Sequence, residues 1–366
     1  MIIIACGGTG GHIYPGLAVA KHLEEKGASV RFIGSDSRME KDKIPQEGYA
    51  FDGLPVQQLK KKTPFRSGFA LLRSFLSARR ILKAYRPEAV VGFGSYITVP
   101  TILAAASLRI PIGLIETNVV AGKANRVMGK LATFVTLAYE KTAAEFPSTP
   151  THLVGSPIRP DFQFVSRQEG ASFFELDPNK KVISILGGSQ GAQKINEILI
   201  KIIPNLIHDL DLQIVHVCGP LHIKKMEAST QEYAGHPQYR LLHYVENMPA
   251  LLACTDLAIS RAGASALAEF LACQVPSILI PGTFGGGHQK DNAIAIEEGD
   301  AAVMLLEKSL NAEALLSLIE DVMMDTERLE RMQQNCSRLN PLNAAEAIAN
   351  LVLKHTTHQK EDTLYA

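Results

Sequence analysis

The sequence has no excess of either charge and no apolar run long enough to cross a membrane. Lysine plus arginine equals aspartate plus glutamate at 37 each, so net charge gives no argument for binding nucleic acid. No apolar stretch approaches the roughly 18 residues that a membrane-spanning helix needs. A strand-like pattern starts at Ile2 without a preceding basic segment, so we expect no secretory signal.

Cysteine is scarce, and no two cysteines have C-x-x-C spacing. An odd number of widely separated cysteines argues against a disulfide framework, so we expect buried thiols in a reducing compartment, the cytoplasm by default. The five are Cys6, Cys218, Cys254, Cys273 and Cys336.

The length predicts two domains, because 366 residues exceed the roughly 250 to 300 that one hydrophobic core usually holds. Two glycine-rich turns support this division. Residues 7–11 (Gly-Gly-Thr-Gly-Gly) follow the apolar run 2–6, and residues 187–191 (Gly-Gly-Ser-Gln-Gly) follow the apolar run 182–186. A short strand, glycines and then a helical pattern open a parallel sheet, and the helix N-terminus stabilises a phosphate. We expect two similar domains that face one cleft.

Strand and helix patterns alternate along the chain, which predicts βαβ crossovers and parallel sheets. A first helix is expected over 15–26, with Pro15 in its first turn and Gly27 at its C-terminal end. A turn-rich connector at 155–160 separates the halves, and a helix over 343–354 precedes a polar tail that we expect to be frayed. The strands are expected at 29–34, 89–93, 182–186, 212–218, 240–245, 256–260, 277–281 and 301–306.

Residues 53–87 contain nine basic residues and no acidic one. Arginines recur there every seven residues, and apolar residues follow the spacing of a buried helix face. Two interpretations stay open: the solvated face of an ordinary core helix, or attraction to an anionic membrane at about 1 kcal/mol per cation. The residues are Arg66, Arg73 and Arg80, with Phe65, Phe69, Leu72 and Leu76.

Neither glycine turn has the dinucleotide or Walker spacing. Ile13 stands where the first fingerprint requires a third small residue, although Asp36 after the second strand keeps a nicotinamide enzyme open as an alternative. Asp209 and Asp211 match the D-x-D spacing of metal-dependent glycosyl transfer, but they join a helix end to a strand start and indicate a surface turn. No histidine pair has ligand spacing, so we expect neither a metal nor a cofactor.

His12 stands where the first glycine turn meets the helix. A lone histidine is often a structural hydrogen-bonder, but this position favours a general base that takes a proton from a sugar hydroxyl. Residues 260–265 form a third strand–glycine–helix turn, followed by Glu269, which suits a ribose diol unless it is a solvated helix carboxylate. Gln289 and Asn292 follow a glycine loop and suit sugar hydroxyls, because an amide both donates and accepts.

Four blocks together resemble the MurG glycosyltransferases, which transfer N-acetylglucosamine from UDP-GlcNAc to undecaprenyl-diphosphoryl-muramyl-pentapeptide. The resemblance spans nearly the whole chain, and the first block is highly specific. The blocks are residues 7–20 (GGTGGHIYPGLAVA), 154–159 (VGSPIR), 187–192 (GGSQGA) and 261–269 (RAGASALAE).

The resemblance implies an α/β GT-B fold of two Rossmann-like domains. We expect an N-terminal acceptor and membrane-associated domain over 1–157 and a C-terminal UDP-GlcNAc domain over 158–342. Residues 343–366 form a helix and tail that could pack back on the N-terminal domain. The activity implied is inverting transfer without metal, at the cytoplasmic face of the bacterial inner membrane. Cell-wall synthesis and division proteins are candidate partners.

The resemblance also implies roles for individual residues. His12, aided by Glu116, would be catalytic. The basic stretch itself, rather than the resemblance, gives the expected membrane contact through Phe65, Arg66, Phe69, Arg73 and Arg80. The donor would contact Thr9, Gly10, Gly11, Asn118, Arg159, Ser189, Val245, Arg261, Ala264, Ser265, Ala266, Leu267, Ala268, Glu269, Gln289 and Asn292.

The chain departs from the family at several positions. Ile115 and Thr117 replace polar residues expected near the transferred sugar, Ser156 replaces an asparagine, and Gly287 replaces an acidic residue. Glu116 and Asn118 are retained, so we expect activity to be retained. Two alternatives stay open: another GT-B enzyme that uses a UDP-sugar, such as a glycolipid glycosyltransferase or an epimerase, and a non-catalytic nucleotide-sugar-binding module.

Overall fold

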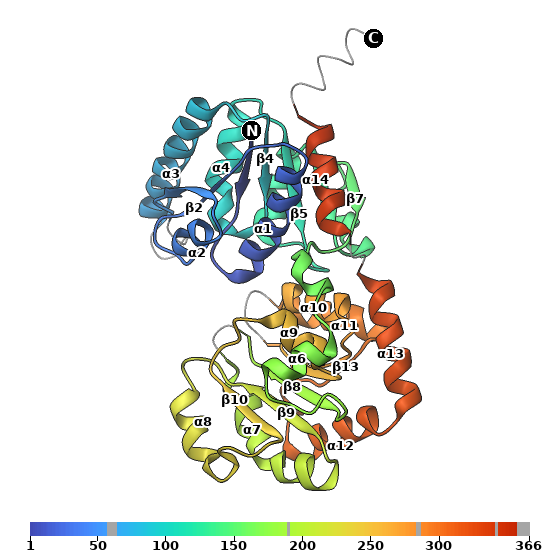
Figure 1. Cartoon of the computed structure of the whole chain (residues 1–366). Helices are drawn as coiled ribbons and strands as arrows, with labels where there is room; N and C mark the ends of the chain where they lie inside the picture. Colours follow the sequence, from blue (N-terminus) through green and yellow to red (C-terminus); the bar gives the residue numbers. More distant parts are fainter. Residues whose placement is uncertain (57–63, 189–190, 283–286, 341–342, 357–366) are drawn as a thin grey trace. The chain divides into compact units, whose positions relative to one another are not determined.

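The computed structural model describes residues 1–56, 64–188, 191–282, 287–340 and 343–356, without the side chains of residues 64–67 and 163. The chain divides into two compact units (Figure 1). Unit 1 comprises Met1–Arg159 with Pro341–Ala366, and unit 2 comprises Pro160–Asn340. The division falls two residues after the boundary expected from the connector. Of the tail expected to be frayed, residues 357–366 lie outside the described residues.

Unit 1 is built on a parallel sheet in the order β3-β2-β1-β4-β5-β6-β7 among the described strands. The strands are β1 Ile2–Ala5, β2 Val30–Ser35, β3 Ala50–Leu54, β4 Ala89–Gly92, β5 Ile112–Glu116, β6 Phe134–Leu137 and β7 Thr151–Leu153. The helices are α1 Gly10–Glu25, α2 Glu40–Gln46, α3 Pro64–Tyr85, α4 Ser95–Ser107, α5 Lys123–Met128 and α14 Ala344–Lys354.

Both faces of this sheet are buried, as the continuous apolar runs of its strands require. Ile2 and Ile4 of β1 pack with α1 and α14 on one face. Ile3 packs with α3 and α4 on the other. The helix α14 lies beside α1 although more than 300 residues separate them (Figure 1), and Lys26 Nζ lies 2.9 Å from Glu346 Oε1.

The first helix begins five residues earlier than expected. Thr9 is its N-cap and Gly10 its first residue, so Pro15 lies inside the helix and its placement in the first turn was wrong. The two glycines at the start concealed the helix, because glycine is a poor helix former. Gly27 follows the helix with φ +82, which confirms the predicted C-terminal end.

The apolar spacing along α3 does not mark its buried face. Ser74, Ala78 and Leu82 are buried, at i, i+4 and i+8, whereas the described side chains of the apolar stripe face solvent. The exposed fractions are 71% for Phe69, 52% for Leu72 and 55% for Leu76. These three residues therefore do not form the buried face of α3, in contrast to the ordinary core helix that was one of the two interpretations. Within the described part of the chain, no helix is both long and apolar enough to cross a bilayer.

Unit 2 has a parallel sheet in the order β10-β9-β8-β11-β12-β13 among its described strands. These are β8 Val182–Leu186, β9 Gln213–Val217, β10 Tyr239–Leu242, β11 Leu257–Ser260, β12 Ser277–Leu279 and β13 Ala302–Met304. The helices are α6 Arg167–Phe173, α7 Gln193–Pro204, α8 Ile223–Ser229, α9 Met248–Cys254, α10 Ala264–Ala272, α11 His288–Glu298, α12 Ala312–Met323 and α13 Thr326–Leu339.

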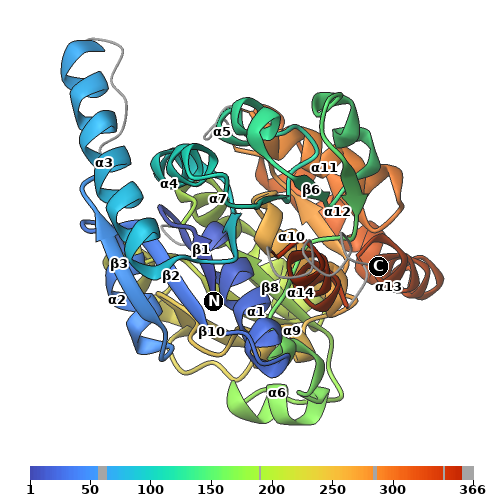
Figure 2. The ribbon, with the colours of Figure 1, turned by 90° about the horizontal axis from the view of Figure 1, so that it is seen from above.

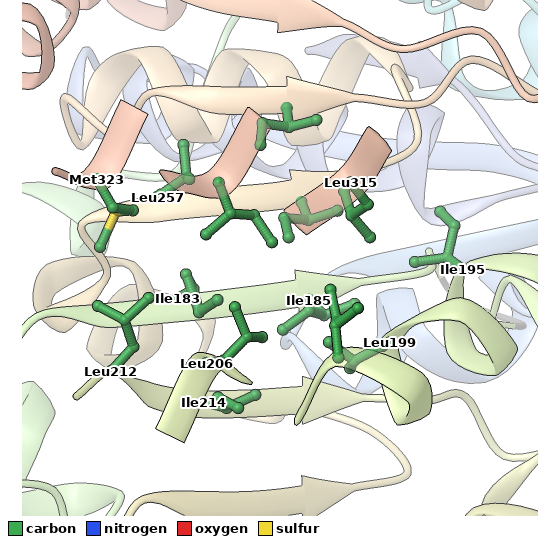
Figure 3. Close-up of a cluster of buried hydrophobic side chains, with 14 of the residues drawn as sticks. Ile183, Ile185, Ile195, Leu199, Leu206, Leu212, Ile214, Leu257, Leu315 and Met323 are labelled. Carbon is green, nitrogen blue, oxygen red and sulfur yellow. The ribbon is translucent and has the colours of Figure 1, made fainter. Parts of the chain in front are cut away.

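One apolar cluster fills the face of this sheet that α7 and α12 cover. Ile183 and Ile185 of β8 contribute to it with Leu199 of α7 and Leu315 of α12 (Figure 3). The parallel sheets of both units confirm the α/β class predicted from the alternation of elements.

We predict that Ile348→Ala lowers the free energy of unfolding by about 2–5 kcal/mol, the usual cost of a large-to-small change in a core. Ile348 is fully buried in the cluster shared by α1 and α14. Asn350→Ala on the exposed side of α14 is the matched control and should change stability by less than about 0.5 kcal/mol. Denaturant titration of both variants measures the difference. Equal stability of the two would contradict the assigned packing.

Candidate active site

The first glycine turn lies where the strand order of unit 1 reverses. From β1 the chain continues through α1 to β2, which pairs with one side of β1. On the other side β1 pairs with β4, with Ala5 opposite Gly92. Ligands bind at such a switch point, at the carboxyl ends of the strands. Two helices start there, α1 after residues 6–9 and α4 after residues 93–94. The turns touch, because a Cβ on Gly8 would lie 3.3 Å from Ser95 Oγ.

The strand pattern at 89–93 predicts β4 but does not by itself identify the turn before α4. Its signal was a strand followed by Gly92, Gly94 and then Ser95. Gly94 and Ser95 both have positive φ, 77 and 71, so the chain turns sharply into the helix. The second side of the switch point could therefore have been recognised from the sequence.

His12 lies in the first turn of α1 and is half-buried. Burial is the main influence on its imidazole and lowers its pKa, against the opposing effects of Glu116, the Phe93 carbonyl and Glu40. The ring is therefore neutral at pH 7. Because the Phe93 carbonyl accepts a hydrogen bond from one ring nitrogen, the other nitrogen carries the lone pair that a general base needs.

Glu116, at the end of β5, organises the loop that follows it. Oε1 accepts from the backbone N–H (3.0 Å) and the side-chain amide (2.9 Å) of Asn118. Oε2 accepts from Gly122 N–H (2.8 Å) and Asn125 Nδ2 (3.0 Å). Because four donors satisfy this buried carboxylate, the geometry favours a role for Glu116 in holding the loop and in acting on His12 through its negative charge. Proton transfer by Glu116 itself stays a prediction.

The departures from the family pattern beside Glu116 differ in their surroundings. Ile115 is buried in the core of unit 1, where it packs with the strands. Thr117 is also buried. The predicted sugar contact of Asn118 stays a prediction, and its side chain is positioned by Glu116.

Arg159 ends the first segment of unit 1, and its guanidinium carbon lies 5.2 Å from the ring centre of Tyr14. A cation over an aromatic face is stabilised by the ring quadrupole. This contact fixes the arginine to α1, the helix that starts at the glycine turn. Its predicted role at the nucleotide stays a prediction.

Unit 2 repeats the switch point between β8 and β11, where Leu186 lies opposite Ser260. The second glycine turn leads into α7 and the 261–263 turn into α10, so the two motifs lie at neighbouring strand ends. Ser260 Oγ donates to the Leu186 carbonyl at 2.8 Å. Gly191 has φ +81, and a Cβ there would lie 2.0 Å from the Cys218 carbonyl oxygen, so only glycine fits. Ser189 lies outside the described residues.

The predicted donor segment at the start of α10 has two kinds of side chain. Ala264, Ser265, Ala266 and Glu269 are partly exposed, whereas Leu267 and Ala268 are buried. The two buried residues support the helix from the core side. The backbone amides at its N-terminus and the exposed side chains are the parts that can meet an anion or a diol.

Other residues expected to contact substrate also have partners within unit 2. Arg261 donates to the Ile280 carbonyl (3.0 Å) and to Glu307 Oε1 (2.9 Å), a hydrogen bond that lowers the pKa of that carboxyl. Asn292 is buried, and its Nδ2 lies 3.3 Å from the Ala262 carbonyl. Gln289 Oε1 accepts from Gly282 N–H at 2.7 Å. The burial of Asn292 favours a positioning role, because it holds the turn before α10.

Val245 follows β10 and is buried, which leaves its backbone as the part suited to recognising a base. Asp211 of the D-x-D sequence is exposed, has φ +48 and pairs with Lys180 at 2.6 Å, as a surface turn would. In the described ranges, no three His, Cys, Asp or Glu side chains are grouped as metal ligands would be.

Comparisons with known proteins agree across both units. The model of the glycosyltransferase family 28 N-terminal domain matches residues 2–137, and that of the family 28 C-terminal domain matches residues 182–351. The crystal structure of Acinetobacter baumannii MurG has a TM-score of 0.76 at 27% identity, covering 96% of this chain and 98% of that one. This similarity confirms the expected GT-B fold.

Curated relatives are similar over almost the whole chain. A protein from Halothermothrix orenii is 34% identical over 362 residues, covering 96% of this chain and 98% of the relative. One from Phocaeicola vulgatus is 34% identical over 361 residues, covering 96% of each. Both are named UDP-N-acetylglucosamine--N-acetylmuramyl-(pentapeptide) pyrophosphoryl-undecaprenol N-acetylglucosamine transferase.

A buried polar network supports the second glycine turn. His216 of β9 bonds to Tyr239 Oη (2.9 Å) and Asn196 Oδ1 (3.0 Å), and Asn196 of α7 donates to the Cys218 carbonyl (2.9 Å). The network therefore fixes α7 against the end of β9. Burial lowers the pKa of His216 to about 3, so the ring is neutral in the folded protein.

We predict that His216 makes stability fall as the pH drops from about 6.5 toward 3. The unfolded chain takes up a proton on this histidine in that range and the folded chain does not, which costs at most about 1.4 kcal/mol per pH unit. Denaturant titrations across this range should show a shallower pH dependence for His216→Gln. The exposed His208→Gln is the control. An unchanged slope in His216→Gln would refute the prediction.

Proposed function

We propose that this chain transfers N-acetylglucosamine from UDP-GlcNAc to a lipid-linked acceptor. The chain belongs to the MurG family within glycosyltransferase family 28. The acceptor is undecaprenyl-diphosphoryl-N-acetylmuramyl-pentapeptide, and the bond forms at its muramyl 4-hydroxyl. This is the last cytoplasmic step of peptidoglycan precursor synthesis. The observation that carries the proposal is 34% identity to named transferases over 96% of the chain.

Unit 2 supplies the donor site in this proposal. The N-terminus of α10, next to the second glycine turn, suits the UDP diphosphate because backbone N–H groups and the helix dipole stabilise negative charge. The proposal places Glu269 at the ribose, the Val245 backbone at the uracil, and Gln289 at hydroxyls of the sugar. Asn292 and the Arg261–Glu307 pair hold the surrounding turns.

Unit 1 supplies the acceptor site and the base. Neutral His12 takes the proton from the muramyl 4-hydroxyl as its oxygen attacks the anomeric carbon, and the C–O bond to UDP breaks on the opposite face. One displacement of this kind inverts the anomeric centre. Glu116 stabilises the imidazolium that forms, because its carboxylate charge already favours the protonated ring. Charge on the departing UDP is stabilised by helix N-termini, and we propose that no metal takes part.

The exposed stripe of α3 is the proposed membrane contact. Phe69, Leu72 and Leu76 are exposed, and the cations Arg73, Arg80 and Lys83 on the same helix are exposed as well. The N-terminal part of α3 projects beyond the sheet of its unit (Figure 2). An amphipathic surface with apolar and basic side chains binds at the interface of an anionic bilayer. We propose a peripheral position at the cytoplasmic face of the inner membrane, where the acceptor resides. Phe65 and Arg66 have no described side chains.

We predict that His12→Ala lowers kcat by roughly 10² to 10⁴-fold with little change in UDP-GlcNAc affinity, because only proton transfer is lost. The assay follows the transfer of radiolabelled N-acetylglucosamine from UDP-GlcNAc to the lipid acceptor, with and without chelator.

In the unmodified protein, kcat/KM should fall as the pH is lowered, with a midpoint below about pH 6.5, since burial lowers the His12 pKa. Weaker donor binding with normal turnover would assign His12 to binding instead. Loss of activity with chelator would refute the metal-free mechanism.

We predict that the double variant Phe69→Ser, Leu72→Ser binds anionic vesicles at least about tenfold more weakly, because insertion requires exposed apolar side chains. Phe164 in unit 2 is 77% exposed, so Phe164→Ser removes a comparable apolar group elsewhere. Flotation with vesicles of phosphatidylglycerol and phosphatidylcholine compares the variants. Equal binding by both would show that α3 is not the contact.

A further inference from the structure

Glu40 is a fully buried carboxylate that the proposed mechanism does not use. It is the first residue of α2 and is 0% exposed. Its two oxygens reach two different strand ends. Oε2 accepts from Gly8 N–H at 3.0 Å, and Oε1 accepts from Ser35 N–H at 3.0 Å. It therefore joins the glycine turn after β1 to the end of β2.

The surrounding chain leaves space for this carboxylate only because two residues are glycine. A Cβ on Gly7 would lie 2.2 Å from Glu40 Oε1, and a Cβ on Gly34 would lie 2.8 Å from Glu40 Cγ. Gly7 and Gly8 also have positive φ, 154 and 94. The glycines of the first motif therefore leave room for the buried Glu40 side chain and also allow the chain to turn sharply.

A buried carboxylate is strongly disfavoured unless donors satisfy it, and a charge-assisted bond to a backbone N–H is stronger than a neutral one. Here the donor is the backbone N–H of Gly8, the residue just before Thr9, which occupies the N-cap position of α1. His12 follows in the first turn, where its backbone N–H bonds to the Thr9 carbonyl at 3.1 Å. A shift of Gly8 therefore moves both the start of α1 and the histidine.

We propose that Glu40 is a positioning residue that fixes the first glycine turn and, through it, the orientation of His12. The role extends the proposed transfer reaction, on which its kinetic readout rests. Glu40 touches neither substrate in this proposal. Glu40 accepts the hydrogen bond from Gly8 N–H, so that N–H is already used. An anion at this turn would therefore bind the backbone N–H groups of the residues after Gly8. Its charge also acts on His12, alongside that of Glu116 and the dipole of the Phe93 carbonyl.

The test compares Glu40→Gln with Glu47→Gln, a matched loss of charge at an exposed position at the end of α2. A glutamine oxygen can accept only one of the two N–H bonds, and its amide then faces the other N–H. We expect Glu40→Gln to lower kcat at least about tenfold with the KM for UDP-GlcNAc within about twofold of the unmodified value. The acid limb of its pH profile should move to lower pH, because a charge that raises the His12 pKa is gone. Glu47→Gln should behave as the unmodified protein.

A folded Glu40→Gln protein with unchanged kcat and an unmoved acid limb overturns the proposal. Glu40→Asp, which keeps the charge but shortens the reach, should also lose turnover. Exchange of the Gly8 amide, followed by NMR in the unmodified protein, tests the bond without any variant or assay. Slow exchange supports the anchor, and exchange as fast as that of an exposed amide overturns it. If the unmodified protein lacks transferase activity, the proposed function fails while this exchange result still decides the role of Glu40.

Discussion

The reversal of strand order beside the first strand of each sheet is the constraint on which both units depend. In unit 1 the reversal lies between β1 and β4, and in unit 2 between β8 and β11. The connections that follow these two neighbouring strands run in opposite directions along the sheet. Their loops therefore diverge and leave a crevice at the carboxyl ends of the strands. A helix begins after each strand, and its first amides point to that edge. The same geometry therefore gives each unit an edge that suits an anion.

Sharp turns at these edges are held from behind by buried polar side chains. Glu40 accepts from the first glycine turn, Glu116 from the loop after β5, and Asn292 donates to the turn before α10. Turns expose backbone N–H and C=O groups that helix and sheet would otherwise satisfy, and buried groups without partners are costly. Buried side chains outside the turns thus determine where the residues on these turns lie.

The sequence allowed a good prediction of elements and motifs but a poor one of burial and support. The described strands of the unit 2 sheet, three strands of unit 1 and three strand–glycine–helix turns followed from local patterns, whereas β3, β5, β6 and β7 were not predicted. The face of α3 did not, because apolar spacing identifies a stripe without showing whether a partner covers it; Ser74, Ala78 and Leu82 pack instead. Glu40 carried no local signal either. Its partners at Gly8 and Ser35 come together only through the pairing of β1 with β2.

By itself the sequence determined the α/β class, the repetition of the glycine turns and the identity of His12 as the candidate base, because these depend on short-range periodicity and residue chemistry. Tertiary structure decided which neighbours those residues have. It brought α14 onto α1, left the apolar residues of α3 in solvent and placed Glu40 behind the first turn. The physical reason is that burial and hydrogen-bond partners are properties of segments far apart in the chain, and they exist only once the strands have paired.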